Sequence, residues 1–391
     1  MAVPRIRFKD DNGQYFPDWS TGRIKDFGYF YYGKSAPKWS VTEDARTPCV
    51  RYGELYSKFN GIVDKIHSYT NIEKSNLKFS KGNEVLVPRV GENPLDFARC
   101  SYLPFKDVAI GEMISVYNTH QNPLFISILF NATCKNKFAR LVEGGNVSNL
   151  YFRYLEEVEI NIPKKEEQQK IATFLTAVDK RISLLQKKVD LLEDYKKGVM
   201  QQLFSQQLRF KDDNGQDFPD WEEKKLGELF KISAGGDIKK ENVSKIKNEI
   251  FKYPIYANSE KNKGLYGYSN FFKIDYECIT VTGRGSLGVA NARKEKFYPI
   301  VRLLVLKPKD NCDVIFYENL INQLNFFHES TGVPQLTSPQ ISTYKVKVPS
   351  YKEQQKIASF LENIDKKTAT INQQVEGMQS FKKGLLQQMF V

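Results

Sequence analysis

Two blocks of this sequence each occur twice, with long divergent stretches between the copies. The first block, residues 7–19, returns 202 positions later as residues 209–221 with one substitution. The second block, residues 167–175, returns 186 positions later as residues 353–361, again with one substitution. Repeats of this kind are not the stacked units of a solenoid. They indicate a duplicated frame that holds two different inserts, as in a protein that performs one task on two targets.

The repeats divide the 391 residues into four parts. With 41% apolar residues, each insert can bury a core of its own. We predict an α+β protein in which two strand-rich, mixed α/β domains are joined by two long helices. The four predicted parts are a first domain at 1–165, a first long helix at 166–206, a second domain at 207–351 and a second long helix at 352–391.

The chain is basic, with 58 Lys and Arg against 46 Asp and Glu and a net charge of +12. This balance fits a polyanionic partner, although a solvated basic surface explains composition alone equally well. No stretch is long and apolar enough to span a membrane, and the first residues lack the apolar core of a signal peptide. The five cysteines are scattered, which favours reduced packing residues. We therefore expect a cytoplasmic protein.

Each long helix is predicted from apolar residues that recur alternately at intervals of four and three. This heptad spacing, with charged and amide residues between, is typical of a coiled-coil seam. Either helix could dock on its own domain or on another chain, but a seam of this period favours packing of the two helices on each other. The predicted seam consists of Ile171, Leu175, Val178, Ile182, Leu185, Val189 and Leu192 in the first helix, and of Ile357, Leu361, Ile364, Ile371, Val375 and Met378 in the second.

If the two helices pack antiparallel, the two halves are related by an approximate two-fold axis. The first block follows the first helix in its second copy, and it would follow the second helix if the chain ends were joined. The fold would then be nearly circular in space.

The inserts are rich in short β-type runs broken by Gly, Pro and Asn. Each insert ends on an alternating strand that stops at a proline, at 158–163 and 344–349. The string 283–288 matches G-x-G-x-x-G, but it leads into another strand instead of a helix, so we interpret it as a hairpin or bulge.

Other signals for chemistry are equally weak. Asp220, Asp237 and Lys239 could form a metal-dependent nuclease site, but the first insert has no matching set. The histidines lack partners at metal-ligand spacing, and no nucleophile elbow is present. We therefore predict no catalytic residue and no metal site.

Recognition chemistry remains, because both inserts combine aromatic, basic, amide and hydroxyl side chains in their loops. Arg and Lys neutralise phosphates, whereas Arg, Asn and Gln can read base edges. Arg89 and Arg284 are the strongest candidates, since each follows a strand at a glycine-rich turn. The predicted DNA-binding residues are Tyr32, Lys34, Arg89, Asn146 and Asn149 in the first insert, and Asn258, Lys261, Lys263, Tyr266, Arg284, Ser286, Arg293 and Gln335 in the second.

The repeated blocks resemble those of the specificity subunits of type I restriction–modification enzymes. The resemblance is carried by the Glu-Gln-Gln-Lys-Ile-Ala segment of the second block and by the helix end at 195–204. The loops at 253–258, 281–288 and 332–336 resemble a second target-recognition domain of that family. The first insert matches it less well, through 51–55 and 89–91.

The resemblance implies a subunit without chemistry of its own, in which each insert reads one part of a split, asymmetric duplex site. It further implies that the helices hold the inserts apart and dock two methylation subunits, which bind S-adenosylmethionine. Restriction subunits that use ATP and Mg²⁺ would join them. Two alternatives remain open on the residues alone: a self-contained DNA modification or cleavage enzyme, and a coiled-coil scaffold that binds no nucleic acid.

Overall fold

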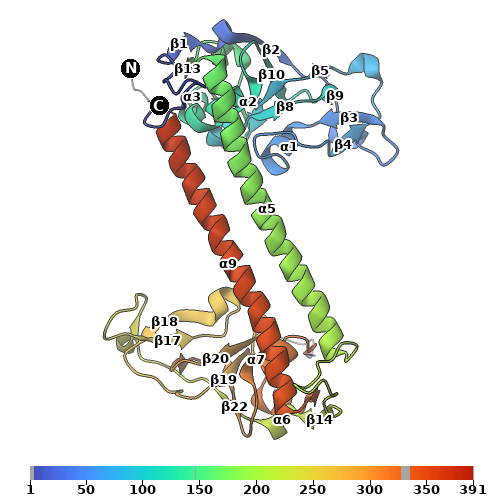
Figure 1. Cartoon of the computed structure of the whole chain (residues 1–391), viewed down its shortest axis with the longest axis vertical. Coiled ribbons are helices and arrows are strands. Elements are labelled where there is room, and N and C mark those ends of the chain that lie inside the picture. The colour runs from blue at the N-terminus through green and yellow to red at the C-terminus, as the bar shows by residue number, and fades with distance from the viewer. Residues whose placement is uncertain (1–3, 146, 327–334, 391) are drawn as a thin grey trace. The chain divides into compact units, whose positions relative to one another are not determined.

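The computed structural model describes residues 4–145, 147–326 and 335–390, and the chain divides into two compact units (Figure 1). Unit 1 comprises Met1–Leu185 and Gln373–Val391, and unit 2 comprises Gln186–Asn372. The two long helices are α5 (Lys165–Phe204) and α9 (Tyr351–Met389), within two residues of the predicted bounds at every end. Each unit therefore contains one insert together with a part of both helices.

Each insert is closed by an antiparallel pair of strands. In unit 1, β1 (Ser20–Arg23) pairs with β13 (Glu159–Ile162), and in unit 2, β14 (Glu222–Lys225) pairs with β23 (Lys345–Val348). Ser20 lies opposite Ile162 and Glu222 lies opposite Val348, which are corresponding positions of the two repeats. The second strand of each pair ends before its proline, as the sequence predicts. The frame therefore closes both inserts in the same register.

Each unit then builds a four-stranded antiparallel sheet with the same order of strands. The sheet of unit 1 is β2 (Gly28–Tyr32), β10 (Ile114–Thr119), β6 (Glu84–Pro88) and β8 (Ser101–Leu103). The sheet of unit 2 is β15 (Phe230–Ala234), β22 (Leu303–Pro308), β19 (Cys278–Thr282) and β20 (Ala290–Arg293). The inserts thus share a core fold that their sequences do not reveal.

Smaller sheets and short helices complete each unit. Unit 1 adds the sheet β4 (Ser68–Thr70), β3 (Thr47–Val50), β9 (Lys106–Ile110), β5 (Phe79–Lys81), the sheet β11 (Glu143–Gly144), β12 (Ser148–Asn149), β7 (Val90–Gly91), and the helices α1 (Tyr52–Ser57), α2 (Pro123–Thr133), α3 (Lys135–Ala139) and α4 (Phe152–Leu155). Unit 2 adds the sheet β16 (Val243–Ser244), β18 (Leu265–Ser269), β17 (Tyr253–Tyr256), β21 (Tyr298–Pro299), and the helices α6 (Leu226–Leu229), α7 (Val314–Ile321) and α8 (Ser338–Ser342). None of the described helices combines the length and apolar composition that crossing a membrane requires.

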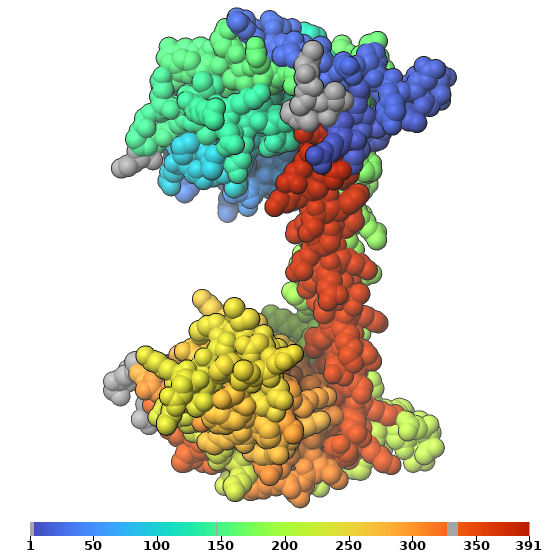
Figure 2. Space-filling model, turned by 90° about the vertical axis from the view of Figure 1, so that its left-hand side faces the viewer, coloured from blue at the N-terminus to red at the C-terminus, as the bar shows by residue number. Residues whose placement is uncertain are grey.

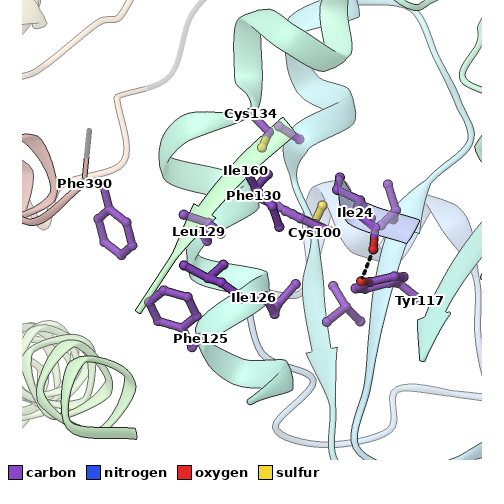
Figure 3. Packing of buried hydrophobic residues seen from close by; sticks show 14 of the residues in the cluster. Ile24, Cys100, Tyr117, Phe125, Ile126, Leu129, Phe130, Cys134, Ile160 and Phe390 are labelled. Carbon is purple, nitrogen blue, oxygen red and sulfur yellow. Dashed lines mark hydrogen bonds between the residues drawn. The ribbon is translucent and has the colours of Figure 1, made fainter. Parts of the chain in front are cut away.

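The core of unit 1 joins its sheet, α2 and the end of α9. The Tyr117 hydroxyl donates to the Ile24 carbonyl oxygen at 2.6 Å inside this core (Figure 3). Phe390, just beyond α9, packs against Phe125 of α2 and against Trp19, with ring centroids 6.0 and 6.1 Å apart. Phe390 is therefore part of the core of the first insert's unit.

The two helices pack on each other within each unit, as the heptad spacing predicts, and they run antiparallel. In unit 1 the start of α5 lies against the end of α9, where Asp179 and Lys382 form an ion pair of 2.6 Å. In unit 2 the end of α5 lies against the start of α9, where Lys196 pairs with Asp365 at 2.7 Å. The two pairs occupy corresponding positions of the repeats, with the partners exchanged.

The predicted seam of the two helices is largely buried. This burial is what a heptad seam requires, because each apolar side chain inserts between residues of the facing helix. Leu192 and Met378 are half-buried. The buried seam residues are Ile171, Leu175, Val178, Ile182, Leu185, Val189, Ile357, Leu361, Ile364, Ile371 and Val375.

A buried ion pair joins the first and second blocks of the frame. In unit 1, Arg7 binds the fully buried Glu167 carboxylate in a bidentate manner, with Nε and Nη2 at 3.2 and 2.8 Å from its oxygens. In unit 2, Arg209 binds Glu353 in the same way, at 3.2 and 2.9 Å. Both guanidinium groups also donate to two carbonyl oxygens at the end of the first block. The arginine thus ties the first block to the start of a long helix.

The neighbouring glutamine connects the helix start to the insert. The Gln168 side chain accepts from the Asn122 backbone N–H at 3.0 Å and donates to the Pro163 carbonyl oxygen at 2.8 Å. Gln354 makes the same two contacts in unit 2, with Asp313 and Pro349, at 3.1 and 3.0 Å. Asn122 and Asp313 are the N-caps of α2 and α7. Every residue of this joint has a counterpart in the other unit.

The chain ends of unit 1 reproduce a continuous segment of unit 2. The Leu208 N–H donates to the Gln202 carbonyl oxygen at 3.1 Å, six residues earlier in the chain. At the corresponding positions of unit 1, the Ile6 N–H donates to the Gln388 carbonyl oxygen at 3.1 Å. The end of α9 thus meets the first block as the end of α5 does, which fits the predicted circular arrangement.

Replacing Arg7 with Ala should destabilise unit 1 strongly, because the Glu167 carboxylate would stay buried without its partner. Loss of one member of a buried pair costs roughly 3–5 kcal/mol. The measurement is urea unfolding of the full chain, followed by circular dichroism. Arg181→Ala, at an exposed position of α5, is the matched control. Adding Glu167→Gln should restore part of the loss, and equal stability of Arg7→Ala and Arg181→Ala would contradict this role.

Candidate nucleic-acid interface

The two arginines that the sequence favours occupy equivalent places in the two units. Arg89 directly follows β6, and Arg284 lies two residues beyond β19, the matching inner strand of the other sheet. Each turn is bound by neighbouring backbone. The Arg89 carbonyl oxygen accepts from Leu150 N–H at 2.8 Å, and the Gly283 carbonyl oxygen accepts from Leu336 N–H at 2.8 Å. Both units therefore place an arginine just beyond the end of the third strand of the sheet.

In unit 1, Arg89 lies against two tyrosine rings. Its guanidinium carbon is 4.5 Å from the ring centroid of Tyr32 and 5.5 Å from that of Tyr151. Its Nε is buried and has no hydrogen-bond partner in the part of the chain that the structure describes. Asn149 lies beside it, opposite Val90 in the β12–β7 pair. Three predicted residues, Tyr32, Arg89 and Asn149, are thus brought together, and stacking restricts the arginine.

This cluster extends to residues that the sequence analysis missed. Arg153 lies 5.2 and 4.7 Å from the ring centroids of Tyr151 and Tyr154. The Tyr154 hydroxyl accepts from Arg153 at 2.8 Å and donates to Glu143 at 2.6 Å. The run of aromatic and basic residues at 151–154 could have predicted this extension from the sequence. The result is a row of alternating tyrosines and arginines beside β7 and β12.

The remaining predicted residues of the first insert are not part of this row. Lys34 is exposed beyond the end of β2, and its backbone N–H donates to the Ile110 carbonyl oxygen at 2.8 Å. Asn146 lies outside the described residues.

In unit 2 the Asn258 side chain holds the Arg284 turn. Its Oδ1 accepts from the backbone N–H groups of Gly283 and Arg284, at 2.6 and 3.2 Å. Its Nδ2 donates to the Arg284 carbonyl oxygen at 2.6 Å. The Asn258 amide is therefore used inside the protein, and it fixes the backbone from which the Arg284 side chain extends.

The Arg284 turn presents several polar groups together. Arg284 forms a backbone bridge to Gln335, whose side chain is exposed, and Ser286 is exposed on the same turn. Gly285 has φ of +76°, a conformation that glycine adopts without strain. The turn connects β19 with β20 as a hairpin, which confirms our interpretation of the G-x-G-x-x-G string. Arg284 itself is half-buried, and we call Arg284, Ser286 and Gln335 together the Arg284 surface.

Arg293 is a correction to the predicted set, because its guanidinium faces the interior. The residue is 3% exposed, its Nε donates to Thr280 Oγ1 at 3.0 Å, and its Nη2 donates to the Lys263 carbonyl oxygen. Burial lowers the pKa of Arg293. The carbonyl it binds belongs to Lys263, which has a positive φ, as does Asn262 before it. Arg293 therefore positions the 261–264 turn.

The other predicted residues of unit 2 lie at the surface. Lys261 and Lys263 are exposed on the turn that Arg293 holds. Tyr266 is exposed in β18, where the Lys245 ammonium lies 3.6 Å from its ring centroid.

Comparison with known proteins gives a family. A family model described as the type I restriction modification DNA specificity domain matches residues 17–194 and 219–377. A Mycoplasma pneumoniae protein named as a type I specificity subunit is 31% identical over 218 residues, which cover 56% of this chain and 58% of that protein. A type I restriction enzyme specificity subunit of Methanocaldococcus jannaschii is 23% identical over 97% of this chain and 94% of its own length.

The fold is also found in solved structures. The crystal structure of the S subunit of the type I restriction–modification system of M. genitalium matches with a TM-score of 0.67 and 18% identity. The match covers 100% of this chain and 99% of that one.

Replacing Asn258 with Ala should loosen the Arg284 turn, because two backbone N–H groups and one carbonyl group would lose their partner. Each such group costs roughly 1–3 kcal/mol when it stays buried and unpaired. Hydrogen exchange at Gly283 and Arg284 should therefore become faster, as measured by NMR or mass spectrometry. Asn311→Ala, at an exposed amide of the same unit, is the control. Unchanged exchange at the turn would show that Asn258 does not hold it.

Proposed function

Because the chain belongs to the family of type I restriction–modification DNA specificity proteins, we propose that it recognises a bipartite, asymmetric site in duplex DNA. Each unit reads one part of that site. The observation that carries this proposal is the equivalence of Arg89 and Arg284. Two inserts of unrelated sequence each present an arginine just beyond the end of the third strand of an equivalent four-stranded sheet, with different residues around it. A base-contacting arginine that is repeated with different neighbours fits a protein that recognises two different DNA sequences.

The chemistry of the two turns supports base recognition. A guanidinium group can donate two hydrogen bonds to one guanine edge, and amides can pair with adenine. Such contacts discriminate best when the side chain is already restrained, because less conformational freedom is lost on binding. Arg89 is restrained by Tyr32 and Tyr151, whereas the Arg284 backbone is restrained by Asn258. The two units thus restrain their arginines through different contacts.

Chemistry is supplied by other subunits in this proposal. The specificity chain docks two methylation subunits, which use S-adenosylmethionine, and restriction subunits that use ATP and Mg²⁺. The long helices set the spacing between the two parts of the DNA site. Support comes from family membership and from the frame, which offers the same residues twice for two copies of one partner.

The direct test replaces Arg89 or Arg284 with Ala in the complex with methylation subunits. Modified adenines mapped by sequencing should show one position relaxed in one part of the site, with the other part unchanged. Loss of a base contact costs roughly 1–3 kcal/mol, whereas loss of a phosphate contact weakens all sequences alike. Arg140→Ala, at an exposed position at the end of α3, is the matched control. Wild-type specificity in both variants would show that these turns do not read DNA.

A second test changes the helices. One heptad inserted after Leu185 alone should disturb the seam and destabilise the protein. Heptads inserted after both Leu185 and Ile371, which are corresponding positions, keep the seam in register. Seven residues add about 10 Å, so the unread gap in the DNA site should lengthen by roughly three base pairs. A folded double-insertion variant that still recognises the original gap would show that the helices do not set the spacing.

A further inference from the structure

A groove on unit 2 is lined by none of the predicted DNA-binding residues. It encloses about 530 Å³ and is formed over β17, β18 and the turn that precedes β21. Part of this face belongs to residues near 250, coloured yellow in Figure 2. Its basic residues are Lys247, Lys252 and Lys296, its aromatic residues are Tyr253, Tyr256 and Tyr268, and Glu295 is its acidic residue.

The three lysines leave their charge available to a ligand. Lys247, Lys252 and Lys296 are exposed, and none forms an ion pair with a carboxylate within the described ranges. The Lys252 ammonium lies 5.3 Å from the Tyr253 ring centroid, and Lys296 lies 4.7 Å from that of Phe272. Aromatic contacts orient a lysine without neutralising it. The rim of the groove therefore carries three positive charges, which come from two loops of the chain.

The acidic residue of the groove is already engaged. Glu295 accepts from the Tyr256 hydroxyl at 2.6 Å. Burial, together with this hydrogen bond, raises the pKa of Tyr256 to about 12, so the phenol keeps its proton. The carboxylate is thus held at the tyrosine, and the net charge of the groove remains positive.

The groove is physically connected to the Arg284 surface. Tyr256 lines the groove, and Asn258, two residues later, binds the Arg284 turn. Arg293 stacks on the Tyr256 ring at 3.4 Å and donates to the carbonyl of Lys263. A duplex that contacts Arg284 would continue along this face, where phosphates follow the bases at regular intervals.

We propose that the groove formed by Lys247, Lys252, Lys296 and the three tyrosines binds the phosphodiester backbone of duplex DNA beside the Arg284 surface. This inference rests on the proposed function and adds to it an anchor that contributes affinity without reading sequence. The tyrosine rings line the floor, and the three ammonium groups pair with phosphates of the DNA backbone.

The test replaces all three groove lysines with Gln in the full chain. Binding to a mixed-sequence DNA duplex is measured by fluorescence anisotropy from about 50 to 200 mM salt. Three lost phosphate contacts should make the negative slope of log affinity against log salt shallower by about 2.7, so the deficit of the variant shrinks about 40-fold over that range. Thermal unfolding by circular dichroism should be unchanged, because the three side chains are exposed.

The charge-matched control replaces Lys231, Lys307 and Lys347 with Gln. All three are exposed in unit 2, and Lys231 and Lys307 face each other across β15 and β22. The control should keep the wild-type slope. Equal losses in both variants, or wild-type binding by the groove variant, would overturn the groove as the anchor. If the wild-type chain itself does not bind the duplex, the proposed function fails instead.

Polyglutamate provides the last arm of the test. If the groove variant loses polyglutamate binding while its duplex binding stays at the wild-type level, the groove accepts an acidic protein surface, and the backbone proposal is wrong. Loss of duplex binding with the expected change in salt slope supports it.

Discussion

The fold depends on a carboxylate buried at the start of each long helix. Glu167 and Glu353 are inaccessible to solvent, and burying such a charge is costly unless it is paired and hydrogen-bonded. Arg7 and Arg209 meet that requirement with two hydrogen bonds each. Since the arginine belongs to the first block and the glutamate to the second, neither block can change alone. This coupling explains why both blocks are retained in both repeats while the inserts between them diverge.

The adjacent glutamine extends the same joint into the variable part of the protein. Gln168 and Gln354 both bind two backbone groups of the insert, the N–H of a helix N-cap and a proline carbonyl oxygen. Backbone contacts place no demand on side-chain identity, so Asn122 in one unit can be Asp313 in the other. An insert therefore fits the frame if it supplies a closing strand pair and a capped helix. The recognition loops lie outside this requirement and are free to differ.

The sequence predicts the parts of this structure that depend on local pattern. The heptad spacing determines both helices and the burial of residues such as Leu175 and Leu361, because helical periodicity alone places them on one face. Proline-terminated alternation likewise locates the strands that close each insert. The positions of Arg89 and Arg284 at turns after strands could also be predicted from the sequence.

Side-chain surroundings were not predictable, because they depend on segments that are distant in sequence. Arginine is usually a surface residue, yet Arg293 is held inside unit 2 by hydrogen bonds to Thr280 and to the Lys263 carbonyl oxygen. Asn258 is of a type that often contacts a ligand, yet its side-chain amide is hydrogen-bonded to a turn 25 residues away in the sequence. The groove lysines come from two loops, one before and one after the Arg284 turn in the sequence. Burial and pairing therefore decide which polar residues remain available to a partner.

The two chain ends show which connections the fold requires. Ile6 and Gln388 make a backbone hydrogen bond that Leu208 and Gln202 also make, although the first pair joins opposite ends of the chain. The contact between a helix end and the first block therefore does not need a covalent link. What each unit does need is one helix start with its buried glutamate and one antiparallel helix end. Since each start and end come from different helices, neither unit is complete with its own repeat alone, and the antiparallel helix pair is what makes the two repeats one protein.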